Sequence, residues 1–369
     1  MTTSVPPEQD RRSPAGVETP AALPPAPGER GWGKLLLAIA ALLFVPHIPQ
    51  FRAIVPVEQT ILLLVPAMAA CVLVGWLSGG RFVAVLLWVA LATLVAVQPA
   101  GSGTTYFTLA RGWSLLLAGA FGLVCLFGPR RPFFPRALTA LTIALAVTVL
   151  IVALVPLTGV RPAEALATEF SRRNGETMAA VRQFIAMYPA QWKELTGKVP
   201  QLGALPDETE KQLAVLARMG GEIFPALLAL ESLAALAVAW AAYHRLARAR
   251  VGPPLAPLRD FRFNDQLVWG LIVGIATLVL PTLAYLQTVG KNLLVFFGAL
   301  YALRGLGVLA WFLAPGALVA TITIGFAMLW WPVLNVVAVL GFVLLVLAAF
   351  GLGLGDTWAD WRRRARPTP

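Results

Sequence analysis

Ten apolar blocks divide this chain, and they constrain its fold more than any other feature of the sequence. Each block holds about 14 to 23 residues, against the roughly 20 that a helix needs to cross the hydrocarbon core of a bilayer. The blocks lie near residues 34–48, 59–77, 82–98, 112–128, 137–157, 223–243, 266–286, 292–313, 315–331 and 333–355.

Composition agrees with a chain that folds in a lipid bilayer. Hydrophobic residues make up 58% of the sequence and charged residues 13%, unlike an ordinary soluble domain. No strand-like alternation with turn signals competes with this interpretation. The sequence therefore predicts an all-α, polytopic transmembrane helical bundle of about ten spans (range eight to ten). The lower count applies because the first and fourth blocks are short, and because Pro332 alone separates the last two, which could form a re-entrant pair.

Basic residues indicate the orientation of the bundle. With the N-terminus in the cytoplasm, 17 lysines and arginines, Arg136 among them, fall on inside segments. Only Arg52, Arg111 and Lys291 fall on short outside loops, which is a strong positive-inside bias. An even number of spans then places both termini in the cytoplasm of a bacterial cell, with the bundle in the inner membrane. The same topology accounts for the net charge of +11, so the charge does not indicate a nucleic-acid partner.

Polar segments divide the chain into five parts. Residues 1–32 are rich in proline and predict a disordered cytoplasmic tail, not a cleaved signal peptide. Membrane helices are expected over 33–157 and 223–356, and a basic cytoplasmic tail over 357–369. Residues 158–222 are expected outside, as a short extracytoplasmic helical insertion.

Apolar residues within that insertion recur at helical spacing. Met178, Val181, Ile185 and Tyr188 predict an amphipathic helix that lies on the bundle or on the membrane surface. A second helix is expected from Glu208 to Arg218. A structured cap is favoured over a dedicated binding domain, because a few short helices form a lid and not a second fold.

Motifs for catalysis, metals and cofactors are not found in the sequence. Cys71 and Cys125 lie within apolar blocks and are interpreted as packing residues. His47 and His244 have no second ligand at metal-binding spacing. The glycines between 351 and 355 are interpreted as small residues that let helices approach closely, because no Walker-type loop surrounds them. The sequence therefore predicts no enzyme, no cofactor and no metal.

Two ionisable residues lie deep in the predicted membrane helices. Arg304 is centred in an uncharged block, and Glu231 lies nine residues into the sixth block. At 1.5 Å per residue, Glu231 and Arg304 lie about 12 Å and 16 Å below the outer boundary. An unpaired charge there costs at least roughly 2.5–3.5 kcal/mol. We therefore expect Arg304 to pair with Glu231, either for structure alone or as a pair that also contacts a substrate or an ion; separate roles are the third alternative.

The end of the chain resembles a known family. The stretch "GLGDTWADWRRR" is similar to the terminal motif of the YybS-like bacterial membrane proteins, whose members are largely uncharacterised. "FPALLALESLAALAVAW", the linker ending in "LRDFRF", and "NLLVFFGALYALRGLGVL", which begins at Asn292, also look like that family in order and spacing. Asn264-Asp265 departs from the pattern, where proline is expected. The residues that match the terminal motif are Gly355, Asp356, Trp358, Asp360 and Arg362.

The resemblance implies a multi-pass membrane protein that is similar in fold to the substrate-binding subunits of energy-coupling-factor vitamin transporters. Those subunits bind a small molecule among their helices and rely on a separate ATPase and a coupling membrane protein. A chain without a nucleotide motif fits that arrangement. Ala92, Ala96 and Ala100 have the small-residue spacing that such docking uses.

Two classes of function stay open on the sequence. One is a small-molecule binding or uptake subunit, with a pocket among the C-terminal spans lined by Glu231, Arg304 and Tyr301. The other is a non-transporting membrane scaffold or assembly protein, which recruits cytoplasmic partners through its basic loops and the last-helix face that carries Asp356 and Asp360. For that face, a solvated helix end is the simpler interpretation.

Overall fold

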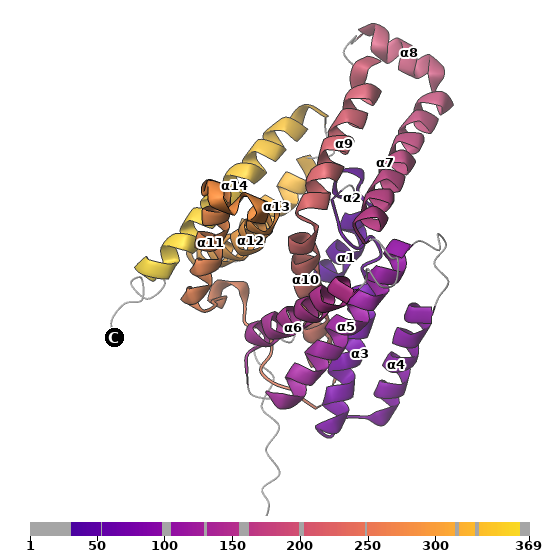
Figure 1. The fold of residues 1–369 in the computed structure, drawn as a ribbon. Coiled ribbons are helices and arrows are strands. Elements are labelled where there is room, and N and C mark those ends of the chain that lie inside the picture. The colour runs from indigo at the N-terminus through magenta and orange to yellow at the C-terminus, as the bar shows by residue number, and fades with distance from the viewer. Residues whose placement is uncertain are drawn as a thin grey trace, which may run out of the picture.

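The computed structural model of this protein describes residues 31–52, 54–97, 105–128, 131–154, 162–198, 203–247, 249–313, 317–328 and 332–361. Over these residues the elements are helices joined by turns, and no strand is present (Figure 1). The predicted all-α helical bundle is confirmed.

The first half of the bundle is assembled around one helix that is buried along most of its length. This helix, α3, packs against α4, α5 and α10, and its buried side chains include Leu63, Met68 and Cys71. Its neighbour α5 meets α6 and α10 through the aromatic ring of Phe121, which lies edge-on to Trp240 with 5.9 Å between ring centroids. The elements are α1 (Trp32–Phe44), η1 (Val45–His47), α2 (Pro49–Arg52), α3 (Ile61–Leu77), α4 (Phe82–Val97), α5 (Thr105–Phe127) and α6 (Phe133–Leu154).

The second half of the bundle is held together by close contacts between backbones. A Cβ atom added at Gly305 would lie 1.7 Å from the carbonyl oxygen of Ala349, and one at Gly353 would lie 1.9 Å from that of Tyr301. Helices α12 and α14 can therefore touch only because these positions have no side chain. The elements are α10 (Phe224–Leu246), η4 (Leu258–Asp260), η5 (Asp265–Leu267), α11 (Val268–Val279), η6 (Pro281–Leu286), α12 (Gln287–Phe312), α13 (Ala317–Met328) and α14 (Pro332–Ala359).

Each of the ten apolar blocks contains a helix, but not every helix is long enough to span a bilayer alone. The seventh block is interrupted because Leu280 is extended and Pro281 cannot continue α11. Five described helices are long and apolar enough to cross a membrane: Thr105–Phe127, Phe133–Leu154, Phe224–Leu246, Pro281–Phe312 and Leu340–Ala359. Shorter apolar helices cover Trp32–His47, Ile61–Leu77, Phe82–Val97 and Asp265–Val279.

Two arginines that were expected in loops lie inside helices. Helix α5 begins at Thr105, seven residues before the predicted block, and so includes Arg111, whose guanidinium lies 4.3 Å from the Phe107 ring centroid. Arg136 is fully buried in α6 and donates to the carbonyl oxygen of Val251 at 3.2 Å. Arginine charge counts predict topology, but they do not reveal which arginines are used for packing.

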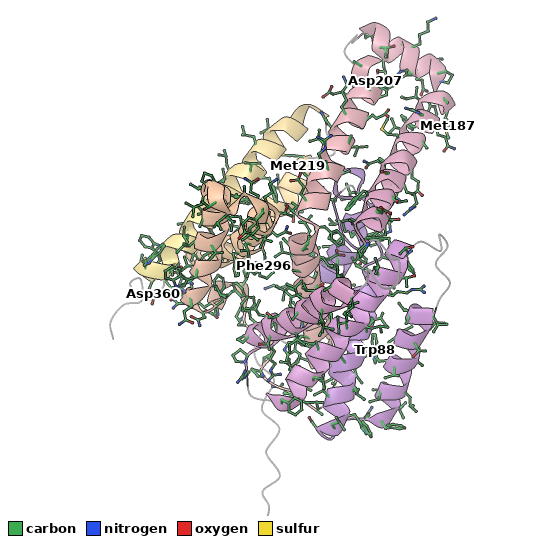
Figure 2. All side chains as sticks on the ribbon, viewed as in Figure 1. Trp88, Met187, Asp207, Met219, Phe296 and Asp360 are labelled. Atoms are coloured by element: carbon green, nitrogen blue, oxygen red, sulfur yellow. The ribbon has the colours of Figure 1, made fainter. Side chains whose placement is uncertain are left out.

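Large apolar side chains cover the outward faces of several helices. Leu87 and Leu94 on α4, Val149 on α6 and Leu347 on α14 are all exposed, and Figure 2 shows side chains that point outward from the helix that carries Trp88. An exposed apolar surface of this extent is typical of a protein that is surrounded by lipid.

An arm of three helices projects from one end of the bundle (Figure 1). It consists of α7 (Pro162–Met187), α8 (Pro189–Lys198) and α9 (Leu205–Glu222). Met187 and Asp207 lie toward its far end and Met219 lies near the bundle (Figure 2). Helix α9 covers part of the apolar stripe of α7, where Met178 packs against Leu213, and α7 also contacts α5 of the bundle.

Candidate functional site

Arg304 is buried, with 3% of its surface exposed. Its partners are two aspartates and not the predicted Glu231. Its Nε donates to Oδ2 of Asp356 at 3.0 Å, and its Nη1 donates to Oδ1 of Asp265 at 2.6 Å. Its Nη2 donates to the backbone carbonyl of Asp356 at 3.2 Å. Asp356 is 1% exposed and the side chain of Asp265 is 58% exposed. These three residues are the Arg304 cluster.

The predicted pairing of Arg304 with Glu231 is therefore wrong. The depth comparison considered only residues inside the apolar blocks. The chain before α11, however, folds back against α12 through η4, and the end of α14 lies along the same helix. Both elements bring a carboxylate to the level of Arg304. Asp265 belongs to the Asn264-Asp265 pair, which stands where the family pattern has proline. One of the two carboxylates that bond Arg304 therefore comes from a position at which this chain differs from the pattern.

Tyr301 lies beside the Arg304 cluster and not in a pocket with Glu231. Its side chain is fully buried, and its ring lies edge-on to Phe263, with 5.0 Å between ring centroids. Phe263 also lies beneath the Arg304 guanidinium, 5.4 Å from its central carbon to the ring centroid. The structure thus brings Tyr301 and Arg304 together and places Glu231 elsewhere.

The residues of the terminal motif have different surroundings. Asp356 is buried in the Arg304 cluster, whereas Asp360 pairs with Arg262 at 2.5 Å. Trp358 is 69% exposed, and Gly355 makes no close backbone approach to another helix. Arg362 lies outside the described residues.

Asn292 connects α12 to the first turn of α10. Its Oδ1 accepts a hydrogen bond from the backbone N–H of Ala226 at 2.8 Å, and its Nδ2 donates to the carbonyl oxygen of Glu222 at 2.9 Å. An N–H in the first turn of a helix has no partner within the helix. Asn292 therefore acts as a cap supplied from a neighbouring helix, which is a structural role.

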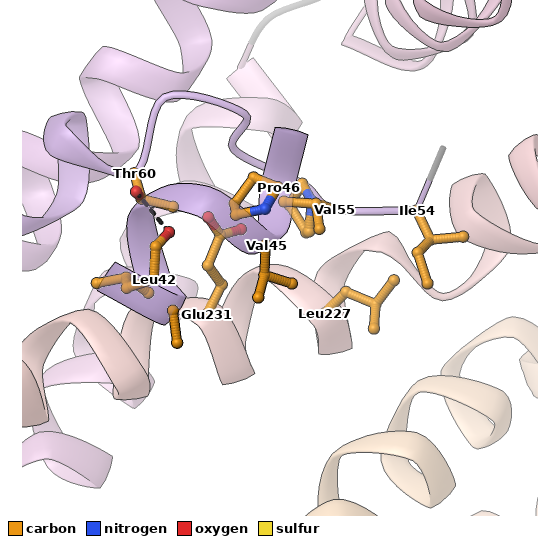
Figure 3. Close-up of a pocket in the computed structure, with 10 residues that line it drawn as sticks. Leu42, Val45, Pro46, Ile54, Val55, Thr60, Leu227 and Glu231 are labelled. Carbon is orange, nitrogen blue, oxygen red and sulfur yellow. Dashed lines mark hydrogen bonds between the residues drawn. The ribbon is translucent and has the colours of Figure 1, made fainter. Parts of the chain in front are cut away.

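Glu231 lines a cavity of about 300 Å³ between α1, α10 and the chain that precedes α3. Its Oε2 accepts a hydrogen bond from the backbone N–H of Val57 at 2.9 Å. Its Oε1 is buried and has no hydrogen-bond partner among the described residues. Figure 3 shows the carboxylate pointing away from α10 among apolar side chains. The lining residues are Ala41, Leu42, Val45, Pro46, Ile54, Val55, Pro56, Thr60, Leu227 and Glu231.

Residues 54–60, here called the cover segment, form one wall of this cavity and are held in place by the arm. Arg173 of α7 donates from Nη1 to the carbonyl of Val55 at 2.7 Å and from Nη2 to that of Pro56 at 3.3 Å. The Tyr106 hydroxyl also donates to the Pro56 carbonyl. Arg173 is 2% exposed, so these bonds are shielded from water. The base of the arm and the Glu231 cavity are therefore parts of one structure.

Arg173 is neutralised by a carboxylate on its own helix. Its Nε donates to Oε1 of Glu169 at 2.8 Å, and Arg172 donates to the same oxygen at 2.6 Å. Burial alone would raise the pKa of Glu169, but the hydrogen bonds from Arg172 and Arg173 hold it below its usual value. Glu169 is therefore charged at neutral pH, and it fixes the direction of the Arg173 guanidinium.

Sequence reasoning found one residue of this site and missed the others. Glu231 was identified because a carboxylate is unusual inside an apolar block. Arg173 and Glu169 belong to a polar segment with many charges, where spacing does not distinguish a buried pair from an exposed one. Tyr106 lies before the predicted start of its block. Pro46 and Pro56 could have indicated that the chain near them is not one continuous helix, but not that it closes a cavity.

Comparison with known proteins identifies a family. The model of the family described as "Predicted membrane protein (DUF2232)" matches residues 38–343, so the chain belongs to this family. The match includes the cover segment, Glu231, Arg304 and Asp265, and it ends before Asp356. It is consistent with the multi-pass membrane family that the terminal motif indicated. No curated protein and no solved structure matches the chain.

Proposed function

We propose that this membrane protein binds a small molecule in the Glu231 cavity and serves as the substrate-binding component of an uptake system. The observation that carries the proposal is a cavity of about 300 Å³ that apolar side chains line together with Glu231; Oε1 of this glutamate is buried and has no hydrogen-bond partner among the described residues. Ligand sites are concave and mostly apolar, with a few polar groups that orient the ligand. A buried polar atom without a partner is costly, and a ligand would satisfy it.

The arginine distribution supports entry of the ligand from outside the cell. The positive-inside bias supports an outer position for the arm, and the cover segment is bonded to the base of that arm through Arg173. In this proposal the cover segment separates the cavity from the extracytoplasmic side. Release of the bonds from Arg173 and Tyr106 to Pro56 would open it.

Energy for uptake would come from a separate ATPase and a coupling membrane protein, because the chain has no nucleotide-binding motif. The predicted docking face on α4 receives no support from packing: Ala92 is buried against Val65 and Ala69 of α3. Ala100 lies outside the described residues. The proposal includes no reaction step, and the site is one of binding.

The scaffold alternative has less support. It relied on Asp356 and Asp360 as a recruiting face at the end of the last helix. Asp356 bonds Arg304 and Asp360 bonds Arg262, so both carboxylates already have partners within the chain.

The proposal is tested by native mass spectrometry of the full chain purified from its membrane. Leu227→Trp is designed to fill the cavity, because Leu227 lines it. Leu246→Trp is the matched control on the same helix, since Leu246 is exposed and outside the cavity. We expect a small molecule to be retained by the wild-type and control proteins and lost from Leu227→Trp. Equal retention by all three proteins, or by none, would contradict the proposal.

A further inference from the structure

We infer that His244 is a pH-sensitive clamp, which holds the chain that follows α10 when its imidazole is protonated and releases that chain as the pH rises. The held segment, residues 249–253, is here called the clamped linker. All five of its residues are described, and none of them belongs to a helix or a strand. Contacts from other elements therefore fix its course. The inference goes beyond the proposed function and does not depend on what the Glu231 cavity binds.

The clamped linker is held by hydrogen bonds from side chains to its backbone carbonyl oxygens. Three of the donors come from the last turns of α10 and one comes from α6, and all four donor side chains are buried. Only one of the four, the imidazole, changes its charge near neutral pH. The donor and acceptor pairs are Tyr243 with Ala249, Arg136 with Val251 at 3.2 Å, His244 with Gly252 at 3.0 Å and Trp240 with Pro253 at 3.2 Å.

Both ring nitrogens of His244 face carbonyl oxygens. Nδ1 lies 2.9 Å from the oxygen of Trp240, one turn earlier in α10, and Nε2 lies 3.0 Å from the oxygen of Gly252. A carbonyl oxygen only accepts, and a neutral imidazole has one donor nitrogen and one acceptor nitrogen. Both contacts have the length of a hydrogen bond, so each nitrogen carries a proton. In this arrangement His244 is an imidazolium.

The groups around His244 partly favour and partly oppose that charge. The residue belongs to the last turn of α10, where the helix dipole favours a cation. The guanidinium of Arg136 opposes it, because a Cβ atom added at Gly252 would lie 2.5 Å from its Nη2. Within the described part of the chain, His244 forms no salt bridge with a carboxylate. The ionisable groups on the elements around this end of α10 are Lys34 (α1), Cys71 (α3), Cys125 (α5), Arg136 (α6), Tyr243 and Arg245 (α10) and Arg250 in the clamped linker.

Loss of one proton leaves one of the two contacts without a hydrogen. The neutral ring can donate either to Trp240 or to Gly252, and at the other contact a nitrogen lone pair faces a carbonyl oxygen. Trp240 is fixed within the helix, whereas Gly252 belongs to a segment without helical bonds, so the clamped linker is the part that moves. The closed form binds one more proton than the open form. Closure is therefore favoured at low pH and is lost as the pH rises.

The clamped linker connects the two halves of the bundle. Beyond it the chain continues into η4, which packs on α12, and into η5, which carries Asp265 of the Arg304 cluster. Release of the clamped linker from α10 would loosen this connection. The positive-inside bias supports a cytoplasmic position for the segment, so the pH of the cytoplasm would act on the clamp.

A neutral His244 with a purely structural role predicts a different outcome. It would bond one carbonyl oxygen at every pH, and amide exchange in the clamped linker, once corrected for intrinsic rates, would not change with pH. The inference instead requires that protonation of the ring and protection of the linker change together.

The test uses the untagged full chain in lipid nanodiscs. The chain has two histidines, so His47→Gln leaves His244 as the single imidazole. Its nitrogen-15 resonances report protonation from about pH 5 to about pH 9. Amide exchange in the clamped linker is followed by mass spectrometry and corrected for intrinsic rates. We expect two protonated nitrogens in acid, and protection that falls about tenfold or more as one proton is lost, as for a hydrogen bond to a charged group.

Two variants separate the clamp from other effects of pH. His244→Gln supplies an uncharged donor that can reach Gly252 at every pH, so we expect its clamped linker to stay protected and to lose the pH dependence. His47→Gln changes the other histidine, which is exposed in η1. It is the matched control and should keep the pH dependence of the wild-type protein.

Each other outcome would overturn the inference. A neutral His244 at about pH 5 would do so, and so would an imidazolium that persists to about pH 9. Titration of His244 without a change in linker protection would show that the ring does not hold the segment. Persistence of the pH dependence in His244→Gln, or its loss in His47→Gln, would assign it to another group. The resonances of His47→Gln decide the question even if His244→Gln does not fold.

Discussion

At the scale of single residues, Arg304 and Glu231, the two ionisable groups that the sequence placed deep in the membrane helices, have opposite environments. Arg304 has two carboxylates and a backbone carbonyl as acceptors. Glu231 has one backbone donor and one oxygen without a partner among the described residues. A charge that is fully paired stabilises an interface, whereas a group with unused hydrogen-bonding capacity is characteristic of a binding site. The contrast is what we expect if Arg304 has an architectural role and Glu231 belongs to the proposed binding site.

A double-mutant cycle distinguishes these roles. Removing one partner of a buried pair costs about 3–5 kcal/mol, because the other charge is left buried. We expect Arg304→Leu and Asp356→Asn each to lower the free energy of unfolding by an amount of this order, and the double variant to lose less than the sum. Arg304→Leu combined with Glu231→Gln should lose the sum, because these residues do not meet. The exposed pair formed by Arg182 and Glu210 is the control, with a cost of about 0–1 kcal/mol.

The free energies can be measured by unfolding in mixed detergent micelles. Coupling between Arg304 and Glu231 that equals the coupling between Arg304 and Asp356 would contradict this assignment.

At the scale of elements, the sequence predicted helices better than it predicted the chain between them. Apolar length identified a helix in each block, because the number of residues that cross a bilayer is fixed by geometry. The break at Pro281 and the course of the cover segment depend on contacts with distant parts of the chain. Arg173 reaches the cover segment over 118 positions in sequence, and no local pattern encodes such a contact. For the same reason the partners of Arg304 were not predicted.

The bonding between the arm and the cover segment should depend on pH. The pKa of Glu169 in the folded protein lies below its ordinary value of 4.5, so its pairs contribute stability above that value. This contribution is lost as the pH falls through the lowered pKa, because protonation weakens the bonds to Arg172 and Arg173. We expect amide exchange at Val57, corrected for intrinsic rates, to accelerate as the pH falls below about 4.5. Glu169→Gln should exchange faster at neutral pH and lose this pH dependence.

Glu194→Gln removes an exposed carboxylate of the same arm and serves as the control for that experiment. Exchange at Val57 that is equally slow in the wild-type protein and in Glu169→Gln at neutral pH would show that Glu169 does not hold the cover segment.

At the scale of the whole molecule, the arm and the cavity lie at one end of the bundle, and the Arg304 cluster links α12, α14 and η5 in the other half of the chain. The family match covers the residues that line the cavity and also Arg304 and Asp265 of the Arg304 cluster, but it ends before Asp356. Fold class follows from composition and from apolar length alone. The site does not, because α1 and the cover segment meet α10, which is far from both in sequence: Val57 and Glu231 are 174 positions apart.

The orientation of the bundle is a prediction that the arginine distribution makes for the molecule as a whole. We expect Gly203→Cys, in the arm, to react with a membrane-impermeant thiol reagent in intact cells. Arg259→Cys, an exposed position in the basic linker, should react only after the cells are opened. The native cysteines are buried, so they contribute little background. The reverse pattern would overturn the orientation and, with it, entry of the ligand from outside.

The measurement that most directly tests the central claim, a small-molecule site at Glu231, is the alkylation of Leu227→Cys in the purified full chain. Leu227 lines the cavity, so a thiol there reports whether a small molecule reaches it. We expect a small methanethiosulfonate reagent to modify this cysteine, and a molecule that occupies the cavity to slow the modification in proportion to its occupancy. Mass spectrometry of the digested protein assigns the modified position. Absence of modification at residue 227 would contradict the claim that this cavity is the binding site. An alkylation rate that neither an added ligand nor a retained molecule changes would contradict it as well.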